Sequence, residues 1–319
     1  MDILEIKNLK IHFKTGEGLV HAVDGVDLRL KQAELLGLAG ESGCGKTTTS
    51  LAIPKLLSDN AVIAGGQIIF NGEDLIKKPE KEMREIRGNE IAVIFQGAMN
   101  AFNPLQTIGK QIMEPILIHE KNTGKKEAQK RAKKLLDQVG ISAARFNGYP
   151  HEFSGGMRQR AMIAMALACK PKLVIADEPV TALDVMIQAQ ILRLLRDLCR
   201  EYELSMIMVS HDLGVLSELC DKIAVMYAGK VMEYGSSQEV FSSPKHPYTR
   251  RLMKATPNIY EEKKFVKGIP GYPPNLINLT EGCLFYERCT ERIDECKTKS
   301  PEYKALSGDH YVSCLRCGK

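Results

Sequence analysis

Short apolar runs separated by polar turns dominate the first part of the chain and predict β-strands. Apolar and polar residues alternate over residues 3–6, 20–23 and 26–30, with Gly and Asp between the runs. This alternation is typical of strands with one buried face and predicts an antiparallel β subdomain. Residues 35–39, 173–176 and 206–209 are apolar without alternation, as in strands buried on both faces of a parallel sheet.

Residues 100–168 follow a different pattern, in which apolar side chains recur at helical spacing, for example over residues 125–139. From about residue 235 the chain becomes rich in Pro, Tyr and Cys, which indicates turns. The predicted fold class is α/β, with a nucleotide-binding domain at 1–235 and a small Cys-rich C-terminal domain at 236–319. The first domain is expected to combine a parallel-sheet core, the antiparallel β subdomain and a helical subdomain inserted at about 98–168.

A glycine-rich loop joins the apolar run 35–39 to a Thr-rich helix start. Residues 40–47 read Gly-Glu-Ser-Gly-Cys-Gly-Lys-Thr and match the phosphate-loop pattern G-x-x-x-x-G-K-S/T in its strand–loop–helix context. Lys46 is expected to contact the β- and γ-phosphates of ATP, and the Thr47 hydroxyl to ligate Mg²⁺. The loop predicts a P-loop NTPase with a RecA-like core, in which further nucleotide contacts come from Gly40, Ser42, Gly43, Gly45 and Thr48.

The apolar run 173–176 ends in two carboxylates, Asp177 and Glu178. A strand end at this place can carry Asp177 toward Mg²⁺, while Glu178 points to the other face and can orient and deprotonate an attacking water. An acidic turn after a strand would be weak support by itself. Together with the phosphate loop it predicts an ATPase.

Composition agrees with a globular protein: the chain has 319 residues, of which 44% are hydrophobic and 26% charged, and a net charge of +5. Lys and Arg are spread along the chain rather than clustered, which argues against a nucleic-acid partner.

No apolar run approaches the ~18–20 residues that span a bilayer. The N-terminal residues 1–10 carry acidic side chains and no signal-peptide pattern. We expect a cytosolic protein unless partners hold it at a membrane.

Residues 153–160, Phe-Ser-Gly-Gly-Met-Arg-Gln-Arg, resemble the signature of ABC ATPases, usually written L-S-G-G-Q. Phe and Met depart from that pattern, whereas the phosphate-contacting positions Ser154 and Gly156 are retained. A Ser-Gly-Gly turn alone is a common helix cap, but the octapeptide shortly before the acidic strand end is specific. The resemblance covers about residues 1–250. It implies that Ser154 and Gly156 bind the γ-phosphate of an ATP held by a second subunit.

The resemblance assigns roles to other residues in the same order along the chain. Gln96 resembles the glutamine that senses Mg²⁺ and the attacking water, and residues 182–184 resemble the D-loop. His211 resembles the switch histidine that contacts the γ-phosphate. Phe13 resembles the aromatic residue that stacks on adenine, although an aromatic side chain in a strand is often only part of a core.

The C-terminal region narrows the resemblance to the ATPases of oligopeptide and dipeptide importers. Residues 244–252 and the cysteine pattern of residues 282–317 resemble the corresponding parts of that family. Cysteine spacing and chemistry alone leave iron–sulfur and zinc open. The resemblance favours a 4Fe–4S cluster, with zinc as the alternative, and Cys317 is left without a role. The ligands expected from it are Cys283, Cys289, Cys296 and Cys314.

The family implies an importer at the cytoplasmic face of the plasma membrane. Its expected partners are two transmembrane permease subunits, a second, paralogous ATPase subunit and, indirectly, an extracytoplasmic solute-binding protein. The cargo is expected to be a di- or oligopeptide, with nickel and oligosaccharides left open. A soluble ABC ATPase of translation or DNA repair is the competing class. The single cassette and the lack of long heptad repeats argue against it.

Overall fold

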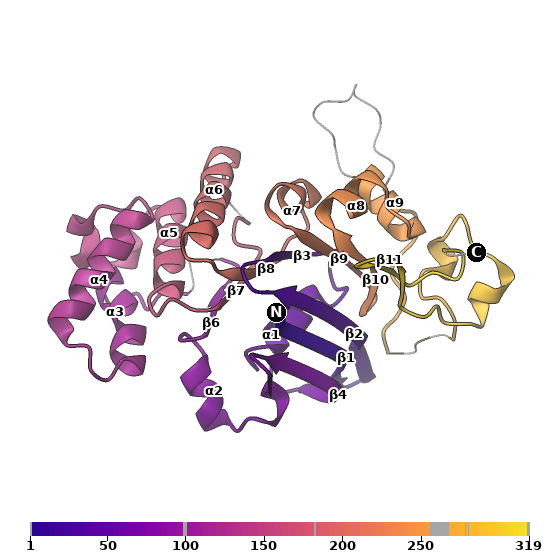
Figure 1. Cartoon of the computed structure of the whole chain (residues 1–319), viewed down its shortest axis with the longest axis horizontal. Helices are drawn as coiled ribbons and strands as arrows, with labels where there is room; N and C mark the ends of the chain where they lie inside the picture. Colours follow the sequence, from indigo (N-terminus) through magenta and orange to yellow (C-terminus); the bar gives the residue numbers. More distant parts are fainter. Residues whose placement is uncertain are drawn as a thin grey trace. The chain divides into compact units, whose positions relative to one another are not determined.

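Internal contacts divide the chain into two units, and their elements are labelled in Figure 1. Unit 1 contains residues 1–76 and 208–319, and unit 2 contains residues 77–207. This computed structural model describes residues 2–97, 101–181, 183–255, 268–277, 279 and 281–317. The predicted start of the helical subdomain at residue 98 lies outside these ranges. The domain boundary at residue 235 stays a prediction.

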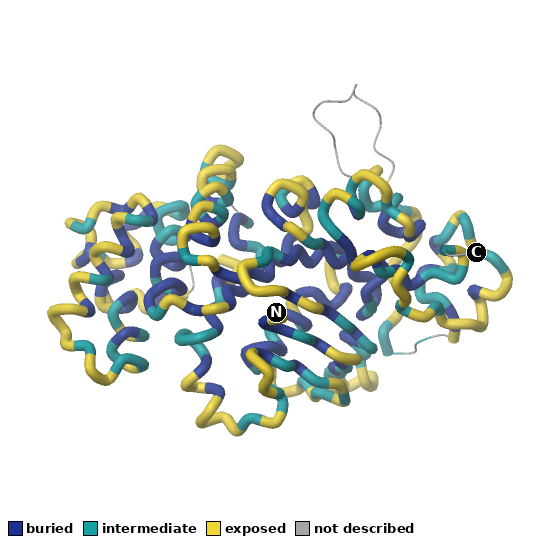
Figure 2. Tube along the Cα trace, viewed as in Figure 1, coloured by how far each residue is buried: buried dark blue, intermediate teal, exposed yellow. Residues whose placement is uncertain are grey.

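The N-terminal part of unit 1 forms an antiparallel sheet. Leu4, Ile6, Leu9 and Ile11 are buried in its first strand, and Figure 2 shows buried and exposed positions along it. The apolar runs 20–23 and 26–30, separate in the sequence pattern, belong to one strand, because Val23 and Val26 both pair with that first strand. The strand order is β2 (Gly18–Lys31), β1 (Asp2–Thr15), β4 (Ala61–Phe70) and β5 (Glu73–Asp74).

Unit 1 also contains a mixed set of strands, in the order β3 (Leu35–Ala39), β9 (Lys222–Tyr227), β10 (Lys230–Ser236), β12 (His310–Val312) and β11 (Lys304–Ser307). β3 and β9 are parallel, whereas the following pairs are antiparallel. The predicted parallel core is therefore found in part, because the sheet here also contains antiparallel pairs. Ala228 and Gly229 both have positive φ, at 49° and 80°, and such a tight turn returns the chain antiparallel.

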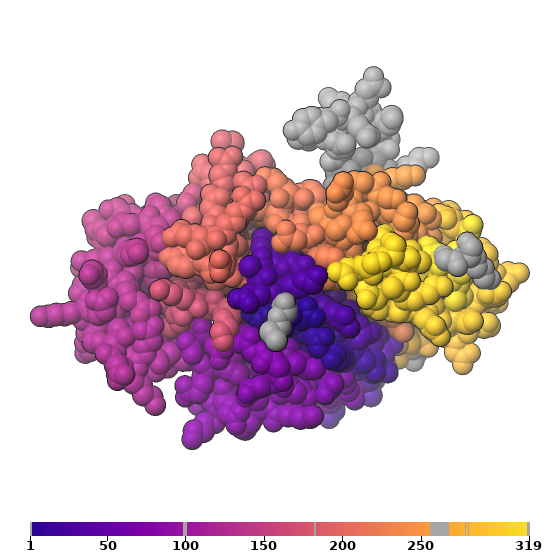
Figure 3. All heavy atoms as spheres, in the orientation of Figure 1, coloured from indigo at the N-terminus to yellow at the C-terminus, as the bar shows by residue number. Residues whose placement is uncertain are grey.

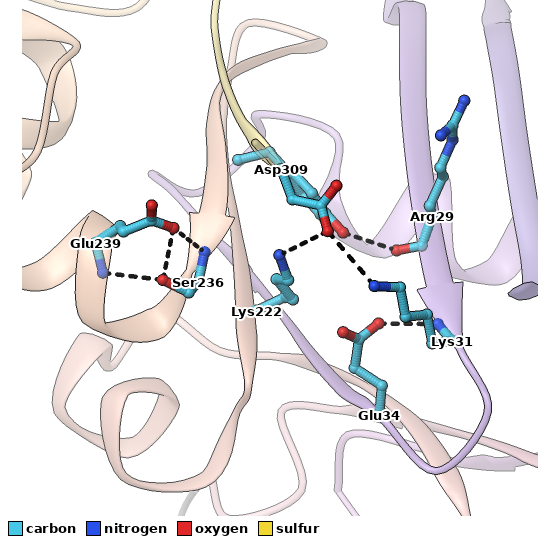
Figure 4. Close-up of polar contacts among 8 residues, drawn as sticks. Arg29, Lys31, Glu34, Lys222, Ser236, Glu239 and Asp309 are labelled. Atoms are coloured by element: carbon cyan, nitrogen blue, oxygen red, sulfur yellow. Dashed lines mark hydrogen bonds and ion pairs between the residues drawn. The ribbon is translucent and has the colours of Figure 1, made fainter. Parts of the chain in front are cut away.

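Side chains attach the C-terminal hairpin to the rest of unit 1. Asp309 Oδ2 lies 3.4 Å from Lys222 Nζ and 3.5 Å from Lys31 Nζ, as drawn in Figure 4. In Figure 3 the yellow C-terminal atoms adjoin the orange atoms of the preceding helices. The helices and 3-10 turns of this unit are α1 (Lys46–Ala52), α7 (Leu213–Leu219), α8 (Ser237–Ser242), α9 (Pro247–Lys254), η4 (Tyr286–Arg288) and η5 (Asp294–Lys297).

Unit 2 contains the parallel strands β6 (Ile91–Ile94) and β7 (Leu173–Asp177). β8 (Ser205–Val209) lies next to β7 and leads out of the unit. Helix α4 buries Ala128, Ala132 and Leu136 at the helical spacing seen in the sequence. The helices and turns are η1 (Leu75–Lys77) at its start, α2 (Glu80–Ile86), α3 (Ile108–His119), α4 (Lys125–Gln138), η2 (Ala143–Asn147), η3 (Pro150–Glu152), α5 (Gly155–Ala166) and α6 (Val185–Glu201).

Within the described ranges, no helix combines the length and the apolar character needed to cross a bilayer.

Candidate functional site

The predicted phosphate loop connects β3 to α1 in unit 1. Gly40 has φ 141°, and a Cβ there would lie 2.2 Å from the Met226 carbonyl oxygen; Gly45 has φ 100°, and a Cβ there would lie 2.4 Å from the Ala22 carbonyl oxygen. Both positions therefore require glycine. Ser42, Gly43 and Thr47 are exposed, and Thr48 is half-buried. Part of the loop, including residue Thr47, is therefore accessible to solvent.

Lys46 is held inside this loop. Its side chain is buried, and Nζ donates hydrogen bonds to the carbonyl oxygens of Gly40 at 2.8 Å and Glu41 at 2.9 Å. The buried ammonium group therefore has polar partners, as a buried charge requires. Burial also raises the pKa of the neighbouring Cys44 thiol, which agrees with a packing role for Cys44 rather than a reactive one.

The predicted carboxylate pair lies at the end of β7 in unit 2. All five residues of this strand are buried, and Asp177 is its last residue. Glu178 follows with φ 45°, a conformation that costs energy in a non-glycine residue and is often found at functional sites. The sequence prediction that the two carboxylates point to different faces stays a prediction.

The structure brings Gln96 and Glu178 into contact. Gln96 Nε2 donates to Glu178 Oε2 at 3.1 Å, across 82 residues of sequence. Thr181 Oγ1 donates to the same oxygen at 2.9 Å. Sequence analysis did not single out Thr181, and the signal that could have found it is its spacing of three residues from Glu178 in a tight turn. Two donors thus orient one carboxylate oxygen.

The signature turn forms the start of α5. Ser154 is the N-cap residue, and its Oγ accepts a hydrogen bond from Met157 N at 3.3 Å. A Cβ on Gly156 would lie 2.8 Å from Ile187 Cγ2, so α6 packs closely here and leaves no room for a side chain. Asp184 caps α6 by accepting from Ile187 N at 3.0 Å. Ala182, the first predicted D-loop residue, lies outside the described residues.

The remaining predicted nucleotide contacts lie in unit 1. His211 follows β8 and is exposed. Phe13 is half-buried in β1, where it pairs with Val20 and Ala61. Gln96, Asp177, Glu178, Ser154 and Gly156 belong to unit 2.

The expected metal centre in the C-terminal region is wrong. Among the residues that the structure describes, no three His, Cys, Asp or Glu side chains gather as ligands of a metal ion, which removes both the 4Fe–4S cluster and the zinc alternative. Burial raises the pKa of Cys283 to about 11 and also raises that of Cys289. A hydrogen bond with Cys317 lowers the pKa of Cys314 to about 6. Cys296, the remaining expected ligand, is buried.

Comparison with known proteins gives two family matches. Residues 23–181 match the ABC transporter family, and residues 232–296 match the oligopeptide/dipeptide transporter C-terminal region. The chain is 45% identical to the oligopeptide transport ATP-binding protein OppD of Salmonella typhimurium over 316 residues, which cover 98% of this chain and 93% of that protein. The chain belongs to the oligopeptide and dipeptide branch of the ABC transporter ATP-binding proteins.

Further relatives agree with this assignment. The dipeptide transport ATP-binding protein DppD of Escherichia coli is 42% identical over 316 residues, covering 98% of this chain and 96% of that protein. Among solved structures, a dimeric ATP-binding cassette in a post-hydrolysis state with ADP and Pi matches with a TM-score of 0.66 and 28% identity. That match covers 73% of this chain and 98% of the cassette. As a member of this family the chain is an ABC-type ATPase.

Proposed function

We propose that this chain hydrolyses ATP to energise the import of di- or oligopeptides. The oligopeptide relative and the dipeptide relative each align with nearly the whole chain. The family that matches the C-terminal region is also named for oligopeptide and dipeptide transporters. The observation that carries the catalytic part is the contact between Gln96 and Glu178. A carboxylate held by an amide and a hydroxyl at a buried strand end is arranged to position water.

The phosphate loop supplies the binding of ATP in this proposal. Its backbone N–H groups and the Lys46 ammonium bind the β- and γ-phosphates, and Phe13 stacks on adenine. The Thr47 hydroxyl and the Asp177 carboxylate fit Mg²⁺, because this ion prefers oxygen ligands. When bound, Mg²⁺ neutralises phosphate charge.

Hydrolysis starts from a water that Glu178 and Gln96 orient. Glu178 Oε2 accepts one proton of this water while the water oxygen forms a bond to the γ-phosphorus. The bond between that phosphorus and the β–γ bridging oxygen breaks, and the bridging oxygen leaves on ADP. His211 donates a hydrogen bond to the γ-phosphate.

A second ATPase subunit completes the site. Ser154 and Gly156 at the start of α5 bind the γ-phosphate of the ATP on the partner subunit. The dimeric cassette that matches this fold supports such an assembly. We place the dimer at the cytoplasmic face of the plasma membrane, on two permease subunits that receive cargo from a solute-binding protein, and the partner ATPase is a paralogue.

Glu178→Gln tests the catalytic assignment. Removing the base should lower kcat by about 10²–10⁴-fold, while ATP binding is retained. Glu203→Gln is the matched control, because Glu203 also has positive φ, at 50°, and is exposed. Phosphate release by the assembled transporter is the measurement, with and without peptide. Hydrolysis by Glu178→Gln at the wild-type rate would show that another group activates the water.

A further inference from the structure

Arg288, in the C-terminal region, reaches into the phosphate loop. Its Nη1 and Nη2 lie 2.8 Å and 2.9 Å from the two carboxylate oxygens of Glu41, the loop residue that follows Gly40. The pair is bidentate, and the Arg288 side chain is 6% exposed. Both residues lie in unit 1, across 247 residues of sequence. No local pattern could have signalled this contact.

The surroundings of Arg288 hold it in one orientation. Nε donates to the Pro270 carbonyl oxygen at 2.9 Å, Nη2 to the Ile269 carbonyl oxygen at 3.2 Å and Nη1 to the Tyr227 hydroxyl at 3.2 Å. With the two bonds to Glu41, all five N–H groups of the guanidinium have an acceptor. This degree of satisfaction is what a buried cation needs.

The C-terminal region also holds the backbone of Glu41. Glu41 N donates to the Tyr248 hydroxyl at 3.1 Å. The Tyr248 ring packs on Tyr227 and Phe285 with centroid distances of 4.7 Å and 5.3 Å, and all three rings are almost fully buried. The carbonyl oxygen of the same Glu41 accepts from Lys46 Nζ at 2.9 Å. A continuous set of contacts therefore runs from Arg288 through Glu41 to Lys46.

The pair has an electrostatic consequence for a loop that binds a polyanion. An unpaired carboxylate at Glu41 would repel the phosphates that Lys46 attracts. At an effective dielectric of about 20, a unit charge about 10 Å away changes the affinity for an anion by about tenfold. Arg288 cancels this charge and turns the carboxylate toward the C-terminal region.

We propose that Arg288 is a positioning residue of the ATP site, which neutralises Glu41 and so allows the phosphate loop to bind ATP tightly. The proposal rests on the proposed function in that it takes the loop around Lys46 to be the ATP site. It gives the C-terminal region a direct role in nucleotide affinity. Disturbance of this region therefore lowers the affinity for ATP.

A charge-rescue experiment with the full-length chain tests the proposal. The Kd of a fluorescent ATP analogue is measured for Arg288→Ala and for Arg288→Ala combined with Glu41→Gln. Arg288→Ala should raise Kd by about tenfold or more. Removing the carboxylate as well should return Kd to within about threefold of wild type, since the repelling charge is gone. Adenosine binding should not change, because adenosine carries no phosphate.

Controls separate this role from a merely structural one. Arg292→Ala removes an exposed arginine of the same segment that contacts Tyr286 and the Glu287 carbonyl oxygen, and it should leave Kd unchanged. If Arg288→Ala does not fold, the same Kd measurements are made on Arg288→Gln and on Arg288→Gln combined with Glu41→Gln, and the same outcomes apply. A double variant that binds ATP as weakly as the Arg288 single variant overturns the proposal, as does a single variant with wild-type Kd. Lys46→Ala tests the proposed function itself: wild-type affinity in that variant refutes the ATP site, whereas lost affinity there together with a failed charge rescue refutes the role of Arg288 alone.

Discussion

A buried histidine makes the stability of unit 1 depend on pH. His246 is 1% exposed and precedes α9, where its Nδ1 accepts a hydrogen bond from Tyr248 N at 3.0 Å. The backbone N–H of His246 donates to Glu233 Oε2 at 2.9 Å. Burial lowers the pKa of His246 from 6.5 to about 3, because the hydration that an imidazolium would lose outweighs its hydrogen bond to the Ser313 backbone. The folded state therefore holds this side chain neutral.

The sign and size of the effect follow from linkage. The pKa of His246 is lower in the folded than in the unfolded chain, so the unfolded chain binds an additional proton between about pH 6.5 and pH 3. Stability falls as the pH falls through this window, by up to about 1.4 kcal/mol for each pH unit. Between pH 7 and pH 5 the expected loss from this residue is about 2 kcal/mol. At pH 7 and above, the contribution vanishes.

The assay is urea unfolding of wild type and His246→Asn at pH 7 and pH 5. Asn can accept the hydrogen bond from Tyr248 N but does not titrate. The apparent free energy of unfolding of the wild type should therefore drop by about 2 kcal/mol more than that of the variant. His151→Asn, an exposed histidine, controls for the loss of a histidine as such. Equal drops for wild type and His246→Asn would refute the reasoning.

Two further predictions concern the catalytic carboxylate and the phosphate loop. Thr181→Val removes the hydrogen bond to Glu178 Oε2 and should lower kcat by about tenfold with little change in KM, measured by steady-state phosphate release; an unchanged kcat would contradict a role for Thr181. Gly40→Ala places a Cβ 2.2 Å from the Met226 carbonyl oxygen and should destabilise unit 1 by about 2–3 kcal/mol, measured by urea unfolding. Wild-type stability in that variant would contradict the close approach.

Much of the candidate site could be predicted from the sequence because its parts are local. The phosphate loop needs glycine at Gly40 and Gly45 for backbone reasons that a short motif records. The strand ending at Asp177 and Glu178 is likewise visible as an apolar run followed by two carboxylates. The spacing of residues 125–139 predicted a helix, and α4 covers residues 125–138. In each case the physical cause acts over a few neighbouring residues.

The differences from the sequence predictions concern segments whose structure depends on distant partners. The sheet of unit 1 is mixed because the turn at Ala228 and Gly229 returns the chain antiparallel, which the apolar runs did not reveal. The cysteines of the C-terminal region were assigned to a metal site on family resemblance. Among the described residues, no three candidate ligands gather there.

By itself the sequence determined the ATPase class, the predicted phosphate loop and the branch of the transporter family, because short motifs encode local backbone geometry and local chemistry. Only the tertiary structure decided that Gln96 and Thr181 share one oxygen of Glu178 and that Arg288 pairs with Glu41. These contacts join residues that are far apart in sequence, as in the 82 residues between Gln96 and Glu178. Their strength comes from burial and from the simultaneous satisfaction of several donors, and both exist only after the chain has folded.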